Sequence, residues 1–363
     1  MFVAWRELRF ARGRFFLIGS VVALITILVG FLSGLTAGLA SQNISSVLQI
    51  PGDRIVLQQP DSGTPSFATS TIGGGTVKAW EGADGVTSVT PIGITQSRAA
   101  LSGTDEPVGI ALYGIPTSAP DAQDNPLVQL APASNDEVGL SKGAADDLGA
   151  AVGDTITLAG ADYTVASIGA DLWYSHTPVV AITPDAWSDV SARTGGTGEA
   201  TALAVSGDAE WQAVGEKTGT TAETTLSSLT ALEAFRSEIG SLGLMIAMLF
   251  GISALVVGAF FTVWTMQRSG DIAVLKALGA TTGSLVRDSL GQALIVLVVG
   301  IGVGIAIVSG VGMLVGSALP FVVNPLTTIA PAAIMAILGL AGAAFALRSV
   351  TNADPLTALG SNR

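Results

Sequence analysis

The sequence predicts a membrane protein with four transmembrane helices and a large extracellular α/β domain between the first and the second. Three observations support this fold class. Charged residues make up only 12% of the chain, about half their share in an ordinary soluble domain. Long uncharged runs recur along the sequence. The segment 42–238 holds 24 acidic and 7 basic residues, so most of the charge lies in one part of the chain.

The first uncharged run predicts a transmembrane helix over residues 15–41. It is almost wholly apolar and exceeds the roughly 20 residues that cross a bilayer. The alternative is a signal peptide cleaved near Ala-Gly-Leu-Ala at 37–40, but its apolar core would exceed the usual length of about 7–15 residues. Residues 1–14 mix arginines with Phe, Trp and Leu. This mixture indicates a cytoplasmic helix at the membrane surface or a simple positively charged anchor.

Three further transmembrane helices are predicted at 236–267, 289–319 and 330–347. No charge occurs from Ile239 to Gln267. The next uncharged run is too long for one helix, and prolines divide it because each removes a backbone donor. These prolines are Pro320, Pro325 and Pro331.

Lys and Arg residues beside the helices predict the orientation, because they favour the cytoplasmic side. They precede the first helix, lie between the second and third, and follow the fourth at Arg348. Both termini, including the tail 348–363, are then cytoplasmic. Residues 42–235 face outward from the cell membrane.

The outward-facing segment predicts a mixed α/β domain. Strands are indicated by DRIVLQQ, TALAVSG, TITLA and YTVASI, and a short helix by Lys142 to Leu148. The Gly-, Ser- and Thr-rich stretch 61–76 predicts an exposed loop. The segment from Thr224 onward predicts one continuous helix that runs into the second span.

The residue types exclude several kinds of chemistry. Cysteine is absent and histidine occurs once, which leaves no disulfide, thiolate site or His-pair metal motif. No G-x-x-x-x-G-K-[ST] phosphate loop occurs. We therefore expect no enzyme activity, no metal and no intrinsic cofactor. An acidic domain is also a poor partner for nucleic acid.

The segment 268–288 predicts a short cytoplasmic helix followed by a loop. Ser269 can cap its start, and Gly279 can take the left-handed conformation at its end. Three apolar residues share one face, at Ile272, Leu275 and Leu278. The spacing alone fits either a helix that only orients its neighbours or a docking element for another subunit. Thr282 can cap a further helix into the third span.

The sequence GDIAVLKALGATTGSLVRDSLGQALIV closely resembles the cytoplasmic loop of ABC-transporter permeases of the MacB/FtsX-like superfamily. NADPLTALG at 352–360 and the stretch beginning GLSKGAADDLGAAVGD at 139 are similar to two further motifs of that superfamily. The resemblance implies a permease that works with a second copy, most simply as a homodimer. It also implies a separate ATPase subunit, present in two copies, that uses ATP. The residues matching the coupling motif are Arg268, Asp271, Ile272, Leu275, Lys276, Leu278 and Gly279.

Gly30, Gly34 and Gly38 form a double GxxxG pattern in the first span. Such a surface lets two helices approach closely, so it predicts either a dimer interface or packing within one chain. Similar glycines in the third span are predicted to pack within the chain. These are Gly300, Gly304, Gly312 and Gly316.

Four helices, a large outer domain and no fused ATPase resemble most closely the haem-efflux permeases of Gram-positive bacteria. The resemblance implies haem as the transported substrate. The alternatives are an FtsX-like regulator of cell-wall hydrolases, or an export permease for lipoproteins, macrolides or peptides. Haem needs an apolar slot, an iron ligand and a cation. The start of the second span offers Glu233, Phe235, Arg236, Glu238, Met245 and Met248, which otherwise mark the interface or face lipid.

A second candidate haem site is DLWYSHTP at 171–178. It holds Trp173, Tyr174 and His176 within a short reach, and Tyr and His both ligate haem iron in other proteins. The alternative is a structural or merely exposed loop histidine.

Overall fold

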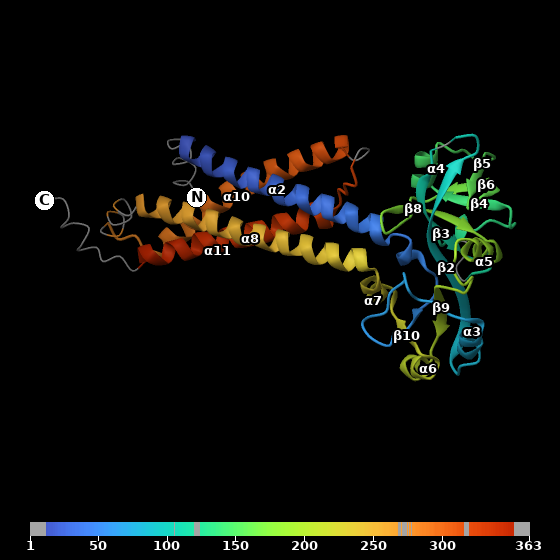
Figure 1. The fold of residues 1–363 in the computed structure, drawn as a ribbon. Helices are drawn as coiled ribbons and strands as arrows, with labels where there is room; N and C mark the ends of the chain where they lie inside the picture. Colours follow the sequence, from blue (N-terminus) through green and yellow to red (C-terminus); the bar gives the residue numbers. More distant parts are fainter. Residues whose placement is uncertain are drawn as a thin grey trace. The chain divides into compact units, whose positions relative to one another are not determined.

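The chain divides into a helical unit, made of residues up to Gly38 and from Gly240 onward, and an α/β unit, Leu39–Ile239 (Figure 1). The computed structural model describes residues 12–351 apart from 105, 120–123, 268–269, 271–273, 275, 277 and 316–318.

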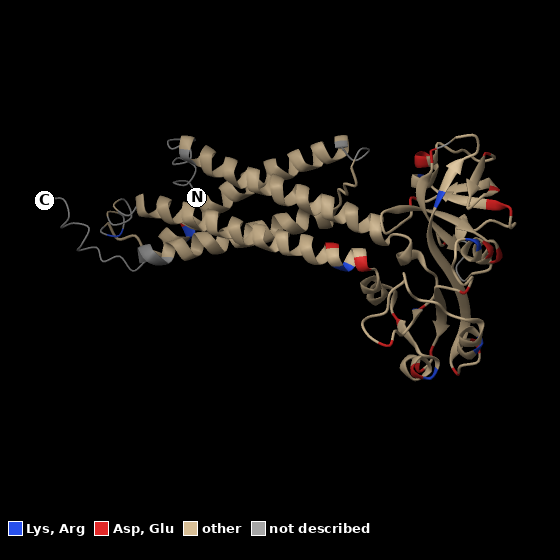
Figure 2. Ribbon diagram, in the orientation of Figure 1, with Lys and Arg blue, Asp and Glu red and all other residues tan. Residues whose placement is uncertain are grey.

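Four long helices are apolar enough to cross a membrane, and they carry few charged side chains (Figure 2). They are α2 (Arg12–Ile44), α8 (Glu233–Gln267), α10 (Thr282–Val315) and α11 (Pro325–Thr351). The α/β unit lies between the first and second of these helices in the sequence. The predicted fold class is therefore confirmed.

Pro320 and Pro325 divide the long apolar run as predicted, whereas Pro331 does not. Pro325 is the first residue of α11, a position where its missing N–H is not needed. Asn324 and Thr327 cap that helix reciprocally, with N–H to side-chain oxygen distances of 3.0 and 2.9 Å. The prediction that the helix is interrupted at Pro331 is wrong, because Pro331 lies inside α11. A membrane helix tolerates such a proline when its neighbours compensate for the lost hydrogen bond.

Small residues let the membrane helices approach closely. A Cβ on Gly300 or Gly304 of α10 would lie within 3.0 Å of α2 atoms. Gly258 of α8 and Gly342 of α11 also meet, since a Cβ on Gly342 would lie 3.1 Å from the Gly258 Cα. Packing of the third-span glycines within the chain is thus confirmed at the described positions, whereas Gly316 lies outside the described residues. The largest buried side chains of this core include Phe261, Trp264, Leu297 and Met335.

One sheet organises the α/β unit. Its strand order is β10-β1-β9-β2-β3-β8-β4-β6-β5, with β7 paired to β8. An additional β2–β5 pairing closes six strands into a ring. The strands are β1 (Arg54–Gln58), β2 (Val86–Leu101), β3 (Val108–Gly114), β4 (Glu137–Ser141), β5 (Thr155–Leu158), β6 (Ala161–Gly169), β7 (Trp173–Tyr174), β8 (Thr177–Ile182), β9 (Ala202–Gly207) and β10 (Thr220–Glu223).

The described residues of this unit also form five α-helices beside the sheet. They are α3 (Gly74–Glu81), α4 (Lys142–Leu148), α5 (Pro184–Arg193), α6 (Trp211–Thr218) and α7 (Thr225–Ser228). Helix α5 packs closely on the sheet at two paired glycines, Gly93 of β2 and Gly114 of β3. Any Cβ there would lie 2.1 and 2.5 Å from Trp187 of α5, so only glycine admits this indole.

The four predicted strands and the helix Lys142–Leu148 are confirmed. Two other predictions are wrong. The stretch 61–76 is not simply an exposed loop, because Phe67 and Ile72 are buried in the core and α3 begins at Gly74. The helix entering the second span is not continuous from Thr224. It breaks at Leu232, which has an extended backbone and a buried side chain.

Candidate functional site

A polar cluster joins the end of α2, the β7–β8 turn and the start of α8 within the α/β unit. Ser175 and His176 form the turn, with positive φ angles of 45° and 64°. Two such residues match the twist of a tight hairpin but are unusual without glycine. Their N–H groups donate to the carbonyl oxygens of Asn43 and Gln42 at 3.1 and 2.9 Å. The turn therefore satisfies carbonyl groups that a helix end leaves open.

Three side chains meet in this cluster. Asn43 is fully buried, donates to a carboxylate oxygen of Glu238, and its Nδ2 lies 3.0 Å from Nε2 of His176. That imidazole nitrogen also lies 3.3 Å from the Glu238 carboxylate. Nε2 can accept from Asn43 only when unprotonated and can donate to Glu238 only when protonated. The tautomer of His176 therefore decides which of these two contacts is a hydrogen bond.

Asn43 was not among the predicted site residues. The available signal is its position, since it follows a long apolar run as an amide buried at a helix end. Its Oδ1 is buried and has no hydrogen-bond partner among the described residues. A buried unpaired carbonyl is uncommon, and leaving it unpaired costs free energy.

The structure separates the other predicted haem residues of the α/β unit. Glu233 is exposed in the first turn of α8, and Arg236 donates to the Thr64 hydroxyl at 2.9 Å. Phe235 instead packs partly buried against the domain core. The Tyr174 prediction is wrong as an accessible ligand, because its side chain is 6% exposed in that core. Burial also raises the pKa of Tyr174, which disfavours a tyrosinate.

Trp173 has a structural role in the same loop. Its indole N–H donates to Asp171 at 2.7 Å, and its backbone N–H donates to the Ser45 hydroxyl at 2.8 Å. Ser46 in turn donates to the Trp173 carbonyl oxygen at 2.8 Å. These bonds attach the hairpin to the segment that follows α2.

Two methionines lie on an exposed stripe of α8 in the helical unit. Met245 is 49% exposed and Met248 is 60% exposed. Their neighbours on the same stretch are also exposed, and no described helix of this chain covers them. These neighbours are Leu244, Ile252 and Leu255.

The predicted coupling segment is described only in part. Arg268, Asp271, Ile272 and Leu275 lie outside the described residues. Leu278 is 79% exposed, and Gly279 has a φ of +95°, as its predicted capping role requires. The Gly279 N–H donates to the Lys276 carbonyl oxygen at 3.0 Å. The cap of the following helix is Thr281 rather than Thr282, because α10 begins at Thr282 and Thr281 accepts from the Ser284 N–H.

Two family models match the chain. The model described as MacB-like periplasmic core domain matches residues 16–221, which is more than half of the chain. The model described as FtsX-like permease C-terminal matches residues 243–355. The chain belongs to the MacB/FtsX family of ABC-transporter permeases.

Relatives of this permease match along their full length. A protein of Staphylococcus epidermidis named as the hemin transport system permease HrtB is 24% identical, with all of both chains covered. Its namesake in Staphylococcus haemolyticus is 26% identical, with 99% of each chain covered.

Two solved structures are similar to part of the permease. The periplasmic region of MacB from Actinobacillus actinomycetemcomitans is 12% identical and gives a TM-score of 0.35, covering 51% of this chain and 94% of its own. The extracellular domain of the ABC-type transporter YknZ from Gram-positive bacteria is 15% identical and gives a TM-score of 0.30, covering 49% and 92%.

The glycine face of α2 is filled by the permease's own chain, so its prediction as a dimer interface is wrong. A Cβ on Gly30 would lie 3.0 Å from a Val308 methyl, and one on Gly34 would lie 2.4 Å from the Phe321 ring. A Cβ on Gly38 would lie 1.7 Å from the Pro320 carbonyl oxygen. The GxxxG spacing does indicate a close approach, but the approaching element belongs to the same chain.

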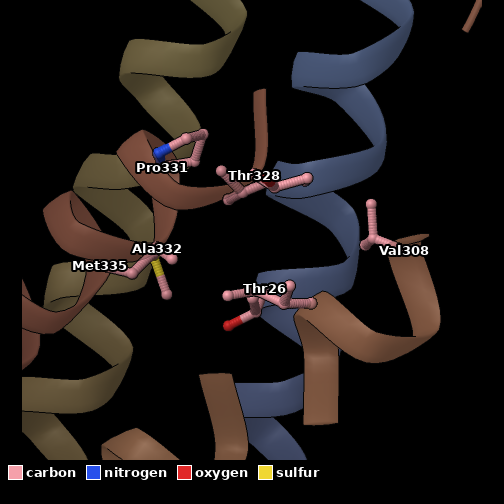
Figure 3. A pocket seen from close by; sticks show the side chains of 9 residues that line it. Thr26, Val308, Thr328, Pro331, Ala332 and Met335 are labelled. Carbon is pink, nitrogen blue, oxygen red and sulfur yellow. The ribbon is translucent and has the colours of Figure 1, made fainter. Parts of the chain in front are cut away.

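The helical unit also contains a small cavity between α2, α10 and α11 (Figure 3). Its volume of ≈ 10 Å³ is about that of one water probe. The lining is apolar except for Thr26 and Thr328, and it includes Pro331, Ala332 and Met335. A tetrapyrrole cannot enter such a cavity, so this cavity is not a haem site.

Proposed function

We propose that this chain is the permease subunit of a dimeric ABC efflux transporter that exports haem, or a similar amphipathic molecule, from the outer leaflet. The observation that carries the proposal is the full-length match to two proteins named as hemin transport permeases. Haem is here the cargo and not a resident cofactor. ATP is hydrolysed by a separate subunit, because the sequence lacks a phosphate-binding loop of its own.

In this proposal both termini are cytoplasmic and residues 42–235 lie outside the cell. Lys276 and Arg287 support this orientation, since basic residues in short loops favour the cytoplasmic side. The acidic excess of the α/β unit does not bear on the orientation, because long domains are translocated largely regardless of their charge.

The cargo is proposed to contact the exposed stripe of α8 at Met245 and Met248. A thioether is an axial ligand of haem iron in other proteins, and the surrounding exposed leucine and isoleucine side chains suit a flat apolar ring. Glu233, Arg236 and Glu238 remain predicted partners for the iron or the propionates. His176 remains a weaker one, because Asn43 and Glu238 already engage its Nε2.

Haem binding by the purified permease in lipid nanodiscs tests the cargo. The wild type should give a Soret band, and Met245→Leu with Met248→Leu should shift and weaken it. Met313→Leu is the control, because Met313 of α10 is more exposed than either methionine of the stripe, at 76%. Glu233→Gln and Arg236→Gln test the predicted polar partners. Absence of a Soret band in the wild type would favour another cargo.

ATP-driven motion is proposed to reach the permease through the segment around Leu278. Binding of ATP draws two ATPase copies together, the segment moves with them, and the membrane helices shift to expel the cargo. Leu278→Asp should therefore uncouple export and stimulated ATP hydrolysis. Thr282→Asp is the control, because an acid is favourable at the first position of α10. Normal export by Leu278→Asp would remove the proposed role.

The second copy is proposed to meet the exposed stripe of α8, since the glycine face of α2 is already filled. The chain has no cysteine, so single cysteines report contacts without background. Oxidation in membranes should link two copies through one or more cysteines placed at 244, 245, 248, 252 and 255. Val308→Cys should not cross-link, because Val308 is buried at 2% exposure. Failure at every position of the stripe would contradict this interface.

A further inference from the structure

Strand β10 is the end of the sheet. It pairs with β1 on one side, and no described strand lies on its other side. The opposite end of the strand order has no comparable edge, because β5 pairs back with β2. An open edge offers unpaired backbone groups to another extended chain. β10 is therefore the place where this sheet can be extended.

The register shows which backbone groups face the open edge. The Gln59 N–H donates to the Gly219 carbonyl oxygen at 2.9 Å, and the β1–β10 pairing continues in the same register. Because hydrogen-bonded and non-bonded pairs alternate in antiparallel strands, Thr221 and Glu223 bond to β1. The N–H and carbonyl groups of Ala222 then point away from β1, toward the open edge.

A groove lies beside this strand, with a volume of ≈ 620 Å³. This size falls within the range of clefts that hold ligands, about 300–1,000 Å³. Helix α6 forms one wall through Trp211, whose indole stacks on Trp80 with a centroid distance of 6.4 Å and holds the Arg54 guanidinium at 5.7 Å. The Trp211 indole is therefore held in place by contacts with the described side chains around it. The lining residues of the groove also include Glu216, Thr221, Ala222 and Glu223.

Charge indicates what kind of chain fits. Two carboxylates, Glu216 and Glu223, line the groove against the single guanidinium of Arg54, which already stacks on an indole. The domain around the groove is acidic as well, with 24 acidic and 7 basic residues in 42–238. A basic segment is favoured over an acidic one by this field.

We infer that β10 and its groove bind an extended basic segment of a partner polypeptide, which adds one strand to the sheet. Backbone hydrogen bonds to Ala222 fix the segment, and alternate side chains enter the groove, as in other cases of strand addition. Neighbouring lysines then meet Glu216 on the α6 face and Glu223 on the other face, since Glu223 pairs with Ile55 of the domain core. The binding site is independent of the cargo proposed above.

A peptide that alternates lysine pairs with valine pairs, labelled with fluorescein, tests this site on the full-length permease in neutral nanodiscs. Its binding should raise the fluorescence anisotropy and slow hydrogen exchange at the Ala222 amide. The same peptide with N-methyl groups on alternate residues keeps the charge but cannot pair with an edge, so it should not bind. Equal binding of both peptides would overturn the inference.

Charge-reversal variants complete the test. Glu216→Lys with Glu223→Lys should weaken peptide binding about tenfold, which corresponds to about 1.4 kcal/mol. Glu106→Lys with Asp189→Lys is the matched control, because both carboxylates are exposed and neither lines the groove, and it should bind as the wild type does. Equal weakening in all variants would show attraction to the acidic domain only, and no detectable binding by the wild type would also refute the site. Ala222→Pro removes an edge N–H, which an edge strand tolerates, and should abolish binding without lowering the unfolding temperature.

Discussion

Replacing Gly38 with alanine tests whether the glycine face of α2 is filled by the chain itself. A Cβ at this position would lie 1.7 Å from the Pro320 carbonyl oxygen and 2.3 Å from its carbonyl carbon. Both are backbone atoms, so no side-chain rotation makes room, and the segment around Pro320 must move. Overpacking of this kind costs about 1–3 kcal/mol.

Two other glycines of the same helix give a graded comparison. At Gly34 the added Cβ would meet the ring of Phe321, a side chain that can turn, and at Gly30 it would only touch a methyl group at 3.0 Å. The loss of stability should therefore decrease from Gly38→Ala to Gly34→Ala to Gly30→Ala. Gly19→Ala is the control, because no atom lies within 4 Å of its Cβ. It should stabilise the helix by about 0.5–1 kcal/mol.

Thermal unfolding of permease held at one copy per nanodisc measures these effects, followed by the far-UV circular dichroism of the membrane helices. A single copy separates folding from association. If the glycines instead formed a dimer interface, Gly38→Ala would leave the unfolding temperature of one copy unchanged and would alter only the fraction of dimers. That result would refute the packing argument.

Three further predictions concern the α/β unit. Burial raises the pKa of Tyr113 and Tyr174, so their contribution to stability is complete below about pH 10 and is lost as the pH rises toward the folded-state values. Tyr174→Phe should make alkaline unfolding, followed by near-UV circular dichroism, less steep, and an unchanged slope would contradict this. Asn43→Ala removes a buried donor to the cluster and should cost about 1–3 kcal/mol in chemical denaturation. Gly93→Ala should displace the Trp187 indole, lower the unfolding temperature and shift tryptophan emission to the red. Unchanged emission would contradict the close packing of Trp187 on Gly93.

The membrane helices were predictable because lipid imposes a simple rule. Every backbone polar group must be paired within the helix, so an apolar run of sufficient length has few alternatives. The positions of the ends were less predictable. Pro331 removes one hydrogen bond, yet α11 continues through it because it packs between other helices. A rule based on the proline alone omits that packing.

The site was harder to predict, because its residues meet through contacts far apart in the sequence. The motif around His176 indicated a haem ligand. The contacts of its imidazole, however, are made by Asn43 and Glu238, which lie on two different helices. Tyr174 lies next to an exposed turn in the sequence and yet its ring points into the core. That burial results from the packing of the domain core, which the local sequence does not show.

The glycine face shows what a membrane sequence leaves undecided. In water, an apolar stripe must be covered by protein, but in a bilayer the same stripe is equally satisfied by lipid, by a second copy or by the chain's own helix. Glycines add the information that something approaches closely, and at Gly38 that partner is a backbone carbonyl of the same chain. The exposed stripe around Met248 lacks such glycine contacts, so contact with a cargo or a second copy there must depend on side chains that can move apart. A surface of that kind suits a transporter, because it can close and reopen without breaking the packing that holds each subunit together.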